Sequence, residues 1–249
     1  MPAPASASVA AGRGVYVTGT DTGVGKSVTT AALLAALNAA GVRAIGMKPV
    51  ASGSEATPQG LRNADAELLR THSAGTPAYA DVNPCTLVPP IAPHIAAHEA
   101  GVSIALASVQ AAYARLAAGA DRVLVEGVGG WMAPLACAPF QPAPTAQPLM
   151  QADVARALGL PVILVVGLRL GCLNHALLSA RAIAADGCRL VGWIGNRIDA
   201  HMLRAEENLA TLRALLPAPC LGVLPHRGDA ESAVDELAPA LAAAVAALR

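Results

Sequence analysis

Residues Gly19 to Ser27 read GTDTGVGKS, and they directly follow the short apolar run GVYVT, which begins at Gly14. A strand, a glycine-rich turn that ends in Gly-Lys-Ser, and a helix that begins at the lysine form the context of a phosphate-binding loop. The glycines allow backbone N–H groups to turn towards phosphate oxygens, and the amino end of the helix adds a favourable dipole. The stretch therefore predicts a strand–loop–helix unit that holds a nucleotide.

The spacing of this loop departs from the standard pattern. Gly25 comes six positions after Gly19, one more than the standard loop allows, and Thr20 stands where the standard pattern has its first glycine. The loop is thus a working cradle, a degenerate relic or a distinct version with its own chemistry. In a working cradle, Lys26 reaches the β- and γ-phosphates and the hydroxyl of Ser27 binds Mg²⁺. The alternative is an ordinary glycine-rich turn with Lys26 in solvent.

Composition narrows the class of protein. The chain has 249 residues, of which 54% are hydrophobic and 14% charged, with a formal net charge of zero. This composition argues against disorder, and the neutral surface and the six aromatic residues (FWY) argue against nucleic acid as a partner. The apolar runs are too short to span a membrane, and the five scattered cysteines favour a reducing compartment. We expect a cytoplasmic protein with a loose tail over residues 1–13 and one catalytic domain over residues 14–249.

Strand-like and helix-like segments alternate along the chain. Apolar runs begin at residues 14, 42, 121, 161, 188 and 219, and helix candidates lie near residues 26–40, 102–118, 149–158, 172–186, 201–215 and 230–248. Strands that are apolar on both faces and alternate with helices form parallel sheets covered on both sides. The pattern predicts a single-domain α/β fold of the P-loop NTPase type, with a mostly parallel sheet of about seven strands and helices on both faces. Ligands of such sheets bind at the carboxyl ends of the strands.

Three polar residues follow or precede elements near that edge of the sheet. Lys48 ends a predicted strand and precedes Pro49, which favours an extended backbone and projects the lysine from the strand end. Asp65 lies at or near the start of a helix in LRNADAELLR, where capping is the simpler role. Glu126 is expected just past a buried strand in VLVEGVGGW, where an acid has no packing use. Together with Ser27, the two acids offer the hard oxygen ligands that a nucleotide-bound Mg²⁺ requires.

A set of motifs then makes the sequence resemble one family. The stretches are VTGTDTGVGKS, GMKPVASGSE, GLRNADAELL, VNPCTL, PHIAAHE, LVEGVGGW, PVILVVGLRLGCLNHALL and GWIGN. In this order, and over most of the chain from Tyr16 to Pro225, they resemble the dethiobiotin synthetases of biotin biosynthesis. The resemblance implies that the lengthened loop is the family's own version of a working cradle.

The resemblance also implies a reaction. In this family Mg·ATP drives the carboxylation of 7,8-diaminononanoate (7,8-diaminopelargonate) by CO₂ and closes a ureido ring, giving dethiobiotin, ADP and phosphate. An amine of the substrate takes up CO₂ as a carbamate, which attacks the γ-phosphate of ATP to form a carbamic–phosphoric mixed anhydride. The second amine then closes the ring and expels phosphate.

Site residues carry over position by position. By resemblance, Lys48 and Lys26 are catalytic, and Thr22 and Ser52 contact the diamine or its carbamate. The resemblance implies these nucleotide contacts: Gly23, Val24, Gly25, Lys26, Ser27, Val28, Asp65, Glu126, Gly127, Val128, Gly129, Asn196, Arg197, Pro225, His226 and Arg227. It implies Ser27, Asp65 and Glu126 as the Mg²⁺ ligands. It also implies a homodimer in which Gly171, Cys172 and Asn174 reach the substrate of the neighbouring subunit.

Without the family resemblance, the residues also allow other functions for the protein and other roles for single side chains. A P-loop ATPase switch of the partitioning, MinD-like class carries an extra lysine in its loop, and Asp21 stands at that place here. A cobyrinate diamide synthase is an alternative enzyme of the same group, but it depends on a glutaminase domain. Without the resemblance, Asn174 is best explained as a helix cap and Asn196 as a turn residue. His94 and His175 fit core positions as well as they fit chemistry.

Overall fold

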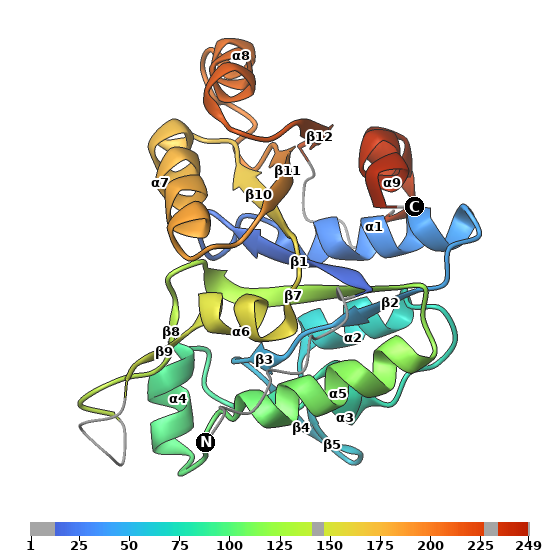
Figure 1. Cartoon of the computed structure of the whole chain (residues 1–249), viewed down its shortest axis with the longest axis vertical. Coiled ribbons are helices and arrows are strands. Elements are labelled where there is room, and N and C mark those ends of the chain that lie inside the picture. The colour runs from blue at the N-terminus through green and yellow to red at the C-terminus, as the bar shows by residue number, and fades with distance from the viewer. Residues whose placement is uncertain (1–12, 141–146, 227–233, 249) are drawn as a thin grey trace, which may run out of the picture.

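The computed structural model describes residues 13–140, 147–226 and 234–248. Its centre is a parallel sheet of six strands in the order β12-β11-β10-β1-β7-β2 (Figure 1). The strands are β1 (Gly14–Gly19), β2 (Ala44–Met47), β7 (Arg122–Gly130), β10 (Val162–Gly167), β11 (Leu190–Asn196) and β12 (Cys220–Leu224). The predicted parallel α/β architecture is confirmed, with six strands in the main sheet where about seven were expected. The expected tail, apart from Arg13, lies outside the described residues.

Six short strands form three small two-stranded sheets beside the main one. They pair as β3 (Val50–Ala51) with β6 (Cys85–Thr86), β4 (Glu55–Thr57) with β5 (Gly60–Arg62), and β8 (Pro134–Ala136) with β9 (Leu149–Met150). These segments are too short to show an apolar run, which is why the sequence pattern did not predict them.

Helices cover both faces of the main sheet (Figure 1). One face packs against α1 (Lys26–Ala39), α2 (Ala64–Thr71), the 3₁₀ helix η1 (Asp235–Leu241) and α9 (Ala242–Leu248). The other packs against α5 (Leu106–Ala118), α6 (Gln151–Leu158) and α7 (Cys172–Ala185), with α8 (Ala205–Leu215) beside α7. The helices α3 (Tyr79–Val82) and α4 (Pro93–Glu99) complete the fold. The single C-terminal helix expected over 230–248 is instead η1 followed by α9, and η1 contains Pro239.

The strands are buried on both sides, which explains their continuous apolar sequences. All six residues of β10 are buried. Alternate side chains point to opposite faces, so Ile163 and Val165 join the core under α1, while Leu164 and Val166 join the core under α7.

The phosphate loop turns sharply between β1 and α1. Gly23 and Gly25 have φ angles of 75° and 82°, a left-handed conformation that glycine adopts without steric cost. The chain enters α1 at Lys26 immediately after the second of these glycines. The predicted strand–loop–helix unit is therefore confirmed.

The register of the sheet brings three sequence motifs to one edge. β1 lies between β10 and β7, and β2 follows β7, with Met47 beside Val125. Lys48 thus leaves β2 close to Glu126 on β7. The expectation that Glu126 lies just past its strand is wrong: β7 continues to Gly130, because the glycines after Glu126 extend the pairing with β1 as far as Gly19.

Candidate active site

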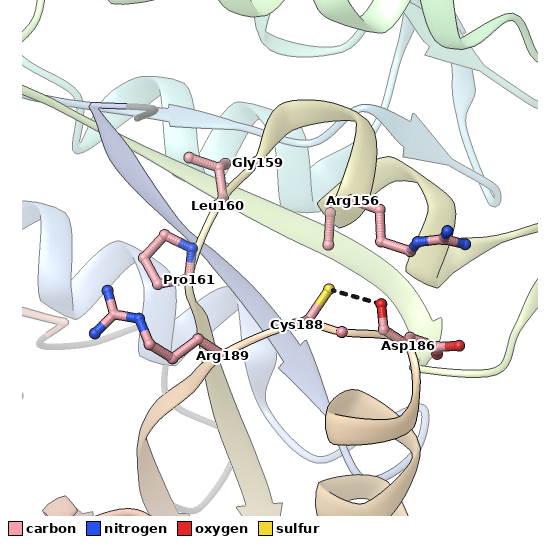
Figure 2. A pocket seen from close by; sticks show the side chains of 9 residues that line it. Arg156, Gly159, Leu160, Pro161, Asp186, Cys188 and Arg189 are labelled. Carbon is pink, nitrogen blue, oxygen red and sulfur yellow. Dashed lines mark hydrogen bonds between the residues drawn. The ribbon is translucent and has the colours of Figure 1, made fainter. Parts of the chain in front are cut away.

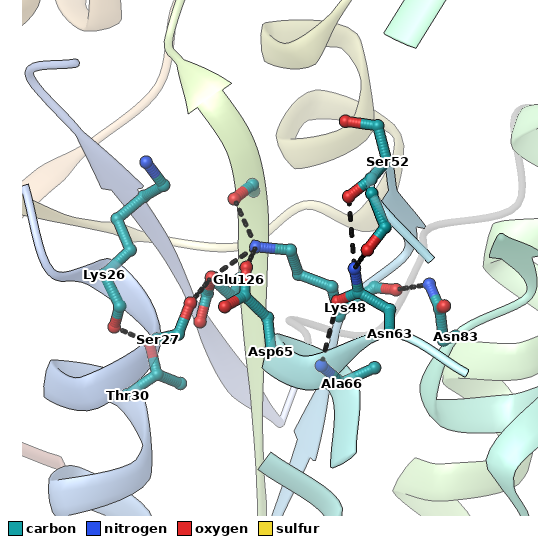
Figure 3. Close-up of polar contacts among 12 residues, drawn as sticks. Lys26, Ser27, Thr30, Lys48, Ser52, Asn63, Asp65, Ala66, Asn83 and Glu126 are labelled. Carbon is teal, nitrogen blue, oxygen red and sulfur yellow. Dashed lines mark hydrogen bonds and ion pairs between the residues drawn. The ribbon is translucent and has the colours of Figure 1, made fainter. Parts of the chain in front are cut away.

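The ammonium of Lys48 lies at the centre of a buried polar cluster (Figure 3). Its Nζ atom lies 2.5 Å from Oε1 of Glu126, 3.0 Å from Oδ2 of Asp65 and 3.5 Å from the carbonyl oxygen of Gly127. Lys48 is only 3% exposed. Burial alone would lower the pKa of this amine, but the carboxylates of Glu126 and Asp65 outweigh it, so the pKa is raised. Lys48 is therefore a fixed positive charge at this site.

Asp65 faces this lysine rather than capping its helix. The N-cap of α2 is Asn63, whose side chain accepts a hydrogen bond from the N–H of Ala66. Asp65 sits in the first turn, and its side chain remains 48% exposed. Burial acts to raise the pKa of Asp65, but the ammonium of Lys48 outweighs it and holds that pKa below its usual range. The helix start thus delivers a charged carboxylate to the cluster.

Glu126 is fully buried, and one of its two carboxylate oxygens has no hydrogen-bond partner. Its Oε1 accepts hydrogen bonds from the hydroxyl of Ser27 at 2.7 Å and from Lys48, whereas its Oε2 is buried without a partner. A buried acceptor without a partner is costly, which points to a cation that satisfies it. Ser27, Asp65 and Glu126 offer only oxygen, the donor that Mg²⁺ prefers. Among the residues that the structure describes, no group of three or more His, Cys, Asp or Glu is placed to hold a metal ion.

Lys26 occupies the phosphate loop itself. Its Nζ donates to the carbonyl oxygen of Asp21 at 2.9 Å, and the residue is 7% exposed. Burial, and after it the nearby charge of Lys48, lower the pKa of Lys26 to about 8. Lys26 and Lys48 are the only two lysines of the chain. Both therefore lie in this one site.

A cleft of about 670 Å³ opens over the cluster. Of the predicted site residues it is lined by Thr22, Gly23, Gly25, Lys26, Ser27, Val28, Lys48, Ser52, Asp65, Val128 and Gly129. Residues that sequence reasoning missed form much of the remaining wall: Pro90, Ile91, Ala92, Pro93, Gly130, Ala133 and Pro134. The run VPPIAP over residues 88–93 was the available signal, but prolines in a loop do not indicate which cavity they border.

Asn196 joins the phosphate loop to a second group of predicted nucleotide contacts. Its Nδ2 donates to the carbonyl oxygen of Val24 at 2.9 Å, and a Cβ added at Gly25 would lie 2.1 Å from that nitrogen. Beyond it, a ring nitrogen of His226 lies 2.9 Å from the carbonyl oxygen of Arg197. Arg227 lies outside the described residues. Asn196 therefore ends β11 as a structural contact of the loop, not as a turn residue.

The residues expected to reach a neighbouring subunit do not line this cleft. Gly171, with φ 96°, is the N-cap of α7 and Cys172 is buried behind it. Asn174 is exposed and forms no capping hydrogen bond, so the simpler explanation of it as a cap is wrong. Leu170 and Leu178 on either side are 91% and 56% exposed.

An ion pair connects the phosphate loop to the turn before α7. Oδ2 of Asp21 lies 2.7 Å from a guanidinium nitrogen of Arg169, and Oδ1 accepts from the N–H of Thr22 at 2.8 Å. Switch ATPases have an additional lysine at this place in the loop. Here the place is taken by Asp21, which pairs with Arg169 of the same chain.

A second cavity, of about 500 Å³, lies at the opposite, amino end of strands β10 and β11 (Figure 2). It is bordered by the ends of α6 and α7 and by Cys188 and Arg189. None of the predicted site residues lines it. The cleft over Lys48 is therefore the candidate active site.

Comparisons with known proteins match most of the chain. Residues 13–233 match a family described as an AAA domain. A relative from Xanthomonas oryzae pv. oryzae, named ATP-dependent dethiobiotin synthetase BioD, is 55% identical over 88% of this chain and 94% of its own length. A relative of the same name from Xylella fastidiosa is 55% identical over 85% of this chain and 89% of its own.

Solved structures show similarity of fold. A MinC:MinD cell division complex from Aquifex aeolicus aligns with a TM-score of 0.53 at 17% identity, covering 94% of this chain and 93% of that one. A ParA family ATPase from Chlorobium tepidum aligns with a TM-score of 0.50 at 14% identity, covering 96% and 99%. These likenesses are to P-loop ATPases and concern the fold alone. Within the described parts of the chain, no helix combines the length and apolar character needed to cross a membrane.

Proposed function

The chain belongs to the family of ATP-dependent dethiobiotin synthetases, and on this premise we propose a substrate and a role for each site residue. The protein is an ATP-dependent ligase that forms C–N bonds. Its proposed substrates are 7,8-diaminononanoate, CO₂ and ATP, and its proposed products are dethiobiotin, ADP and phosphate. The proposed route passes through a carbamate and a carbamic–phosphoric mixed anhydride.

One observation carries the proposed mechanism: the ammonium of Lys48 lies beside two carboxylates at the floor of a cleft that the phosphate loop borders. Phosphoryl transfer spreads negative charge over the transferred group, and fixed cations and N–H donors stabilise that charge. Lys26 and the loop would bind the phosphates, while Lys48 would lie between the carbamate and the γ-phosphate. Asn196 and Arg197, with Pro225, His226 and Arg227, would bind the base.

Mg²⁺ would be held by Ser27, Asp65 and Glu126. When bound, it would neutralise charge on the phosphate oxygens. The fit rests on the unpartnered Oε2 of Glu126 and on the all-oxygen donor set. The nearby Gly127, Val128 and Gly129 would border the nucleotide and substrate, since Val128 and Gly129 line the cleft.

The walls of the cleft suit an alkyl diamine. Thr22 and Ser52 offer hydroxyl groups to the amines or the carbamate, and Ile91, Pro93 and Pro134 offer apolar surface to the alkyl chain. Transfer of apolar surface from water onto such a wall favours binding by about 25 cal/mol per Å².

We further propose a cytoplasmic homodimer, built from one catalytic domain per chain over residues 14–249. The support is the exposed surface at the start of α7, where Leu170 and Leu178 flank Asn174. A second subunit would cover these leucines. Its substrate carboxylate would receive Gly171, Cys172 and Asn174, because the dipole at the amino end of α7 favours an anion.

The decisive experiment measures ADP release with the diamine and bicarbonate both present, compared with either omitted. A dethiobiotin synthetase requires both for full turnover, and dethiobiotin appears in step with ADP. A rate of ADP release that ignores both compounds would identify an ATPase switch and contradict the proposal.

A further inference from the structure

Three polar side chains that the proposed mechanism does not use lie behind the active site. Asn63 and Asn83 are 5% and 3% exposed, and Tyr79 is half-buried with the guanidinium of Arg62 4.1 Å from its ring centre. They come from two segments: Asn63 is the N-cap of α2, while Tyr79 is the first residue of α3 and Asn83 directly follows that helix. Their hydrogen bonds connect the segments that carry Lys48, Ser52 and Asp65.

Asn83 fixes the backbone of Lys48. Its Nδ2 donates to the carbonyl oxygen of Lys48 at 2.6 Å (Figure 3), and the N–H of Lys48 donates to the carbonyl oxygen of Val82 at 2.7 Å. Both backbone polar groups of the lysine are thus held by two consecutive residues, 82 and 83. Pro49 follows Lys48, so this backbone has little freedom to adjust on its other side.

The hydroxyl of Tyr79 links Asn83 to Asn63 through two hydrogen bonds. Its hydroxyl donates to Oδ1 of Asn83 at 3.0 Å and accepts the backbone N–H of Asn63 at 2.8 Å. The side chain of Asn63 in turn donates to the carbonyl oxygens of Ser52 and Gly53, at 3.1 and 3.3 Å.

The hydrogen bonds close into a ring. Asn63 caps α2, the first turn of α2 carries Asp65, and Asp65 accepts from the ammonium of Lys48. The ring therefore fixes both ends of Lys48, its carbonyl through Asn83 and its ammonium through Asp65.

We infer that Asn83, acting through Tyr79 and Asn63, is a positioning residue that sets where the ammonium of Lys48 lies relative to Ser52 and Asp65. The inference rests on the proposed catalytic role of Lys48. A lysine side chain is long and has four rotatable bonds. Its ammonium therefore keeps one position only if the backbone that carries the side chain is fixed. Active-site groups need placement to within about 0.5 Å, and a misplacement of 1 Å costs roughly 10²-fold in rate.

A purely structural role would leave the lysine where it is, so the test must observe the lysine directly. Because the chain has only two lysines, lysine labelled with ¹³C at Cε gives two side-chain signals, which Lys26→Arg assigns. The variant is Asn83→Ala, which removes the donor to the carbonyl of Lys48. The matched control is Thr86→Val, because the hydroxyl of Thr86 also donates to Oδ1 of Asn83, at 2.9 Å, but forms no hydrogen bond with Lys48.

In Asn83→Ala we expect kcat to fall about 10- to 100-fold while ADP affinity is unchanged, since the phosphate loop is untouched. The Lys48 signal should shift, because the ammonium moves relative to the carboxylates of Asp65 and Glu126. The Lys26 signal should stay in place, and Thr86→Val should match the wild type in kcat and in both signals. Tyr79→Phe should show the same changes as Asn83→Ala to a smaller degree.

The inference is overturned if Asn83→Ala keeps the wild-type Lys48 signal, whatever its activity, or if Thr86→Val loses as much kcat as Asn83→Ala. Should Asn83→Ala not fold, Tyr79→Phe decides by the same two measurements. Full activity in Lys48→Ala would instead remove the premise, so failure of the proposed function and failure of this inference are distinguishable.

Discussion

Oε1 of Glu126 accepts both the ammonium of Lys48, at 2.5 Å, and the hydroxyl of Ser27, at 2.7 Å. The hydroxyl of Ser27, a proposed metal ligand, and the ammonium of Lys48, the proposed catalytic cation, therefore share one carboxylate oxygen. Removing one partner of a buried ion pair typically destabilises a protein by about 3–5 kcal/mol, because the other charge stays buried. Variants at this contact should be judged by stability as well as by turnover.

We predict that the two lysines contribute differently. Lys48→Ala should lower kcat by roughly 10²–10³-fold, the loss expected for one preorganised electrostatic donor, while ADP still binds. Lys26→Ala should weaken nucleotide binding and turnover together, since the loop loses its cation. Titration of ADP by calorimetry and steady-state rates separate the two effects. Full activity in Lys48→Ala would contradict its assignment.

Stability of the Lys48→Ala protein offers a second check. Without the ammonium, Glu126 is a buried carboxylate without a charge partner, so the melting temperature should drop. Added Mg²⁺ should then raise the melting temperature more in Lys48→Ala than in the wild type, because it supplies the missing positive charge. An equal Mg²⁺ effect in both proteins would speak against Glu126 as a metal ligand.

We predict that activity requires a hard divalent cation. EDTA should abolish ADP release, and Mg²⁺ or Mn²⁺ should restore it, because the proposed ligands are all oxygen atoms. Glu126→Gln keeps the shape but removes the charge, so it should raise the Mg²⁺ concentration needed for half-maximal rate. Turnover that persists in metal-free buffer would refute the assignment.

Nucleotide affinity should fall as the pH rises through about 8, the pKa of Lys26 in the free protein. Below that pH the amine is already charged. Above it, the neutral amine of Lys26 must take up a proton when ATP binds. This protonation reduces the free energy of binding by up to about 1.4 kcal/mol per pH unit. Calorimetry in buffers of different ionisation enthalpy should therefore show proton uptake on ATP binding near pH 8. Lys26→Arg is the control, because a guanidinium stays charged, and the same uptake there would assign the proton to another group.

A mixing experiment tests the proposed shared site. Lys48→Ala and Asn174→Asp should each be nearly inactive alone, the second because its new carboxylate would face that of the substrate. Co-folded, the mixed dimers contain one site with an intact Lys48 from one chain and an intact Asn174 from the other. Statistical mixing then restores up to about a quarter of wild-type activity. No recovery would show that each site lies within one chain.

Much of the fold followed from periodicity. Runs such as residues 161–167 are apolar without alternation, and they become strands buried on both faces. The short strands around Val50, Glu55 and Pro134 were not predicted, because two or three residues carry no period. The extension of β7 past Glu126 was also missed, since glycines normally indicate the end of a strand and here permit close pairing with β1.

The residues of the candidate site that could be predicted are those whose type is unusual for the sequence around them. An acid directly after an apolar run and a lysine before a proline indicated Glu126 and Lys48. Asn83 and Tyr79 gave no such signal, because their importance comes from hydrogen bonds to other segments of the chain, Asn83 to Lys48 and Tyr79 to Asn63. The role of Asn196 was similarly hidden, since only the fold brings its amide to the carbonyl of Val24.

The confinement of both lysines to the cleft makes amine-directed labelling a way to count active sites. Apart from the terminal α-amine, an activated ester finds no primary amine other than Lys26 and Lys48, which are 7% and 3% exposed. Lys26 has the lowered pKa and is the more nucleophilic of the two at neutral pH. Mass increments that appear slowly, fall on Lys26 first and disappear when ADP is present would report the fraction of molecules with a competent, empty phosphate loop.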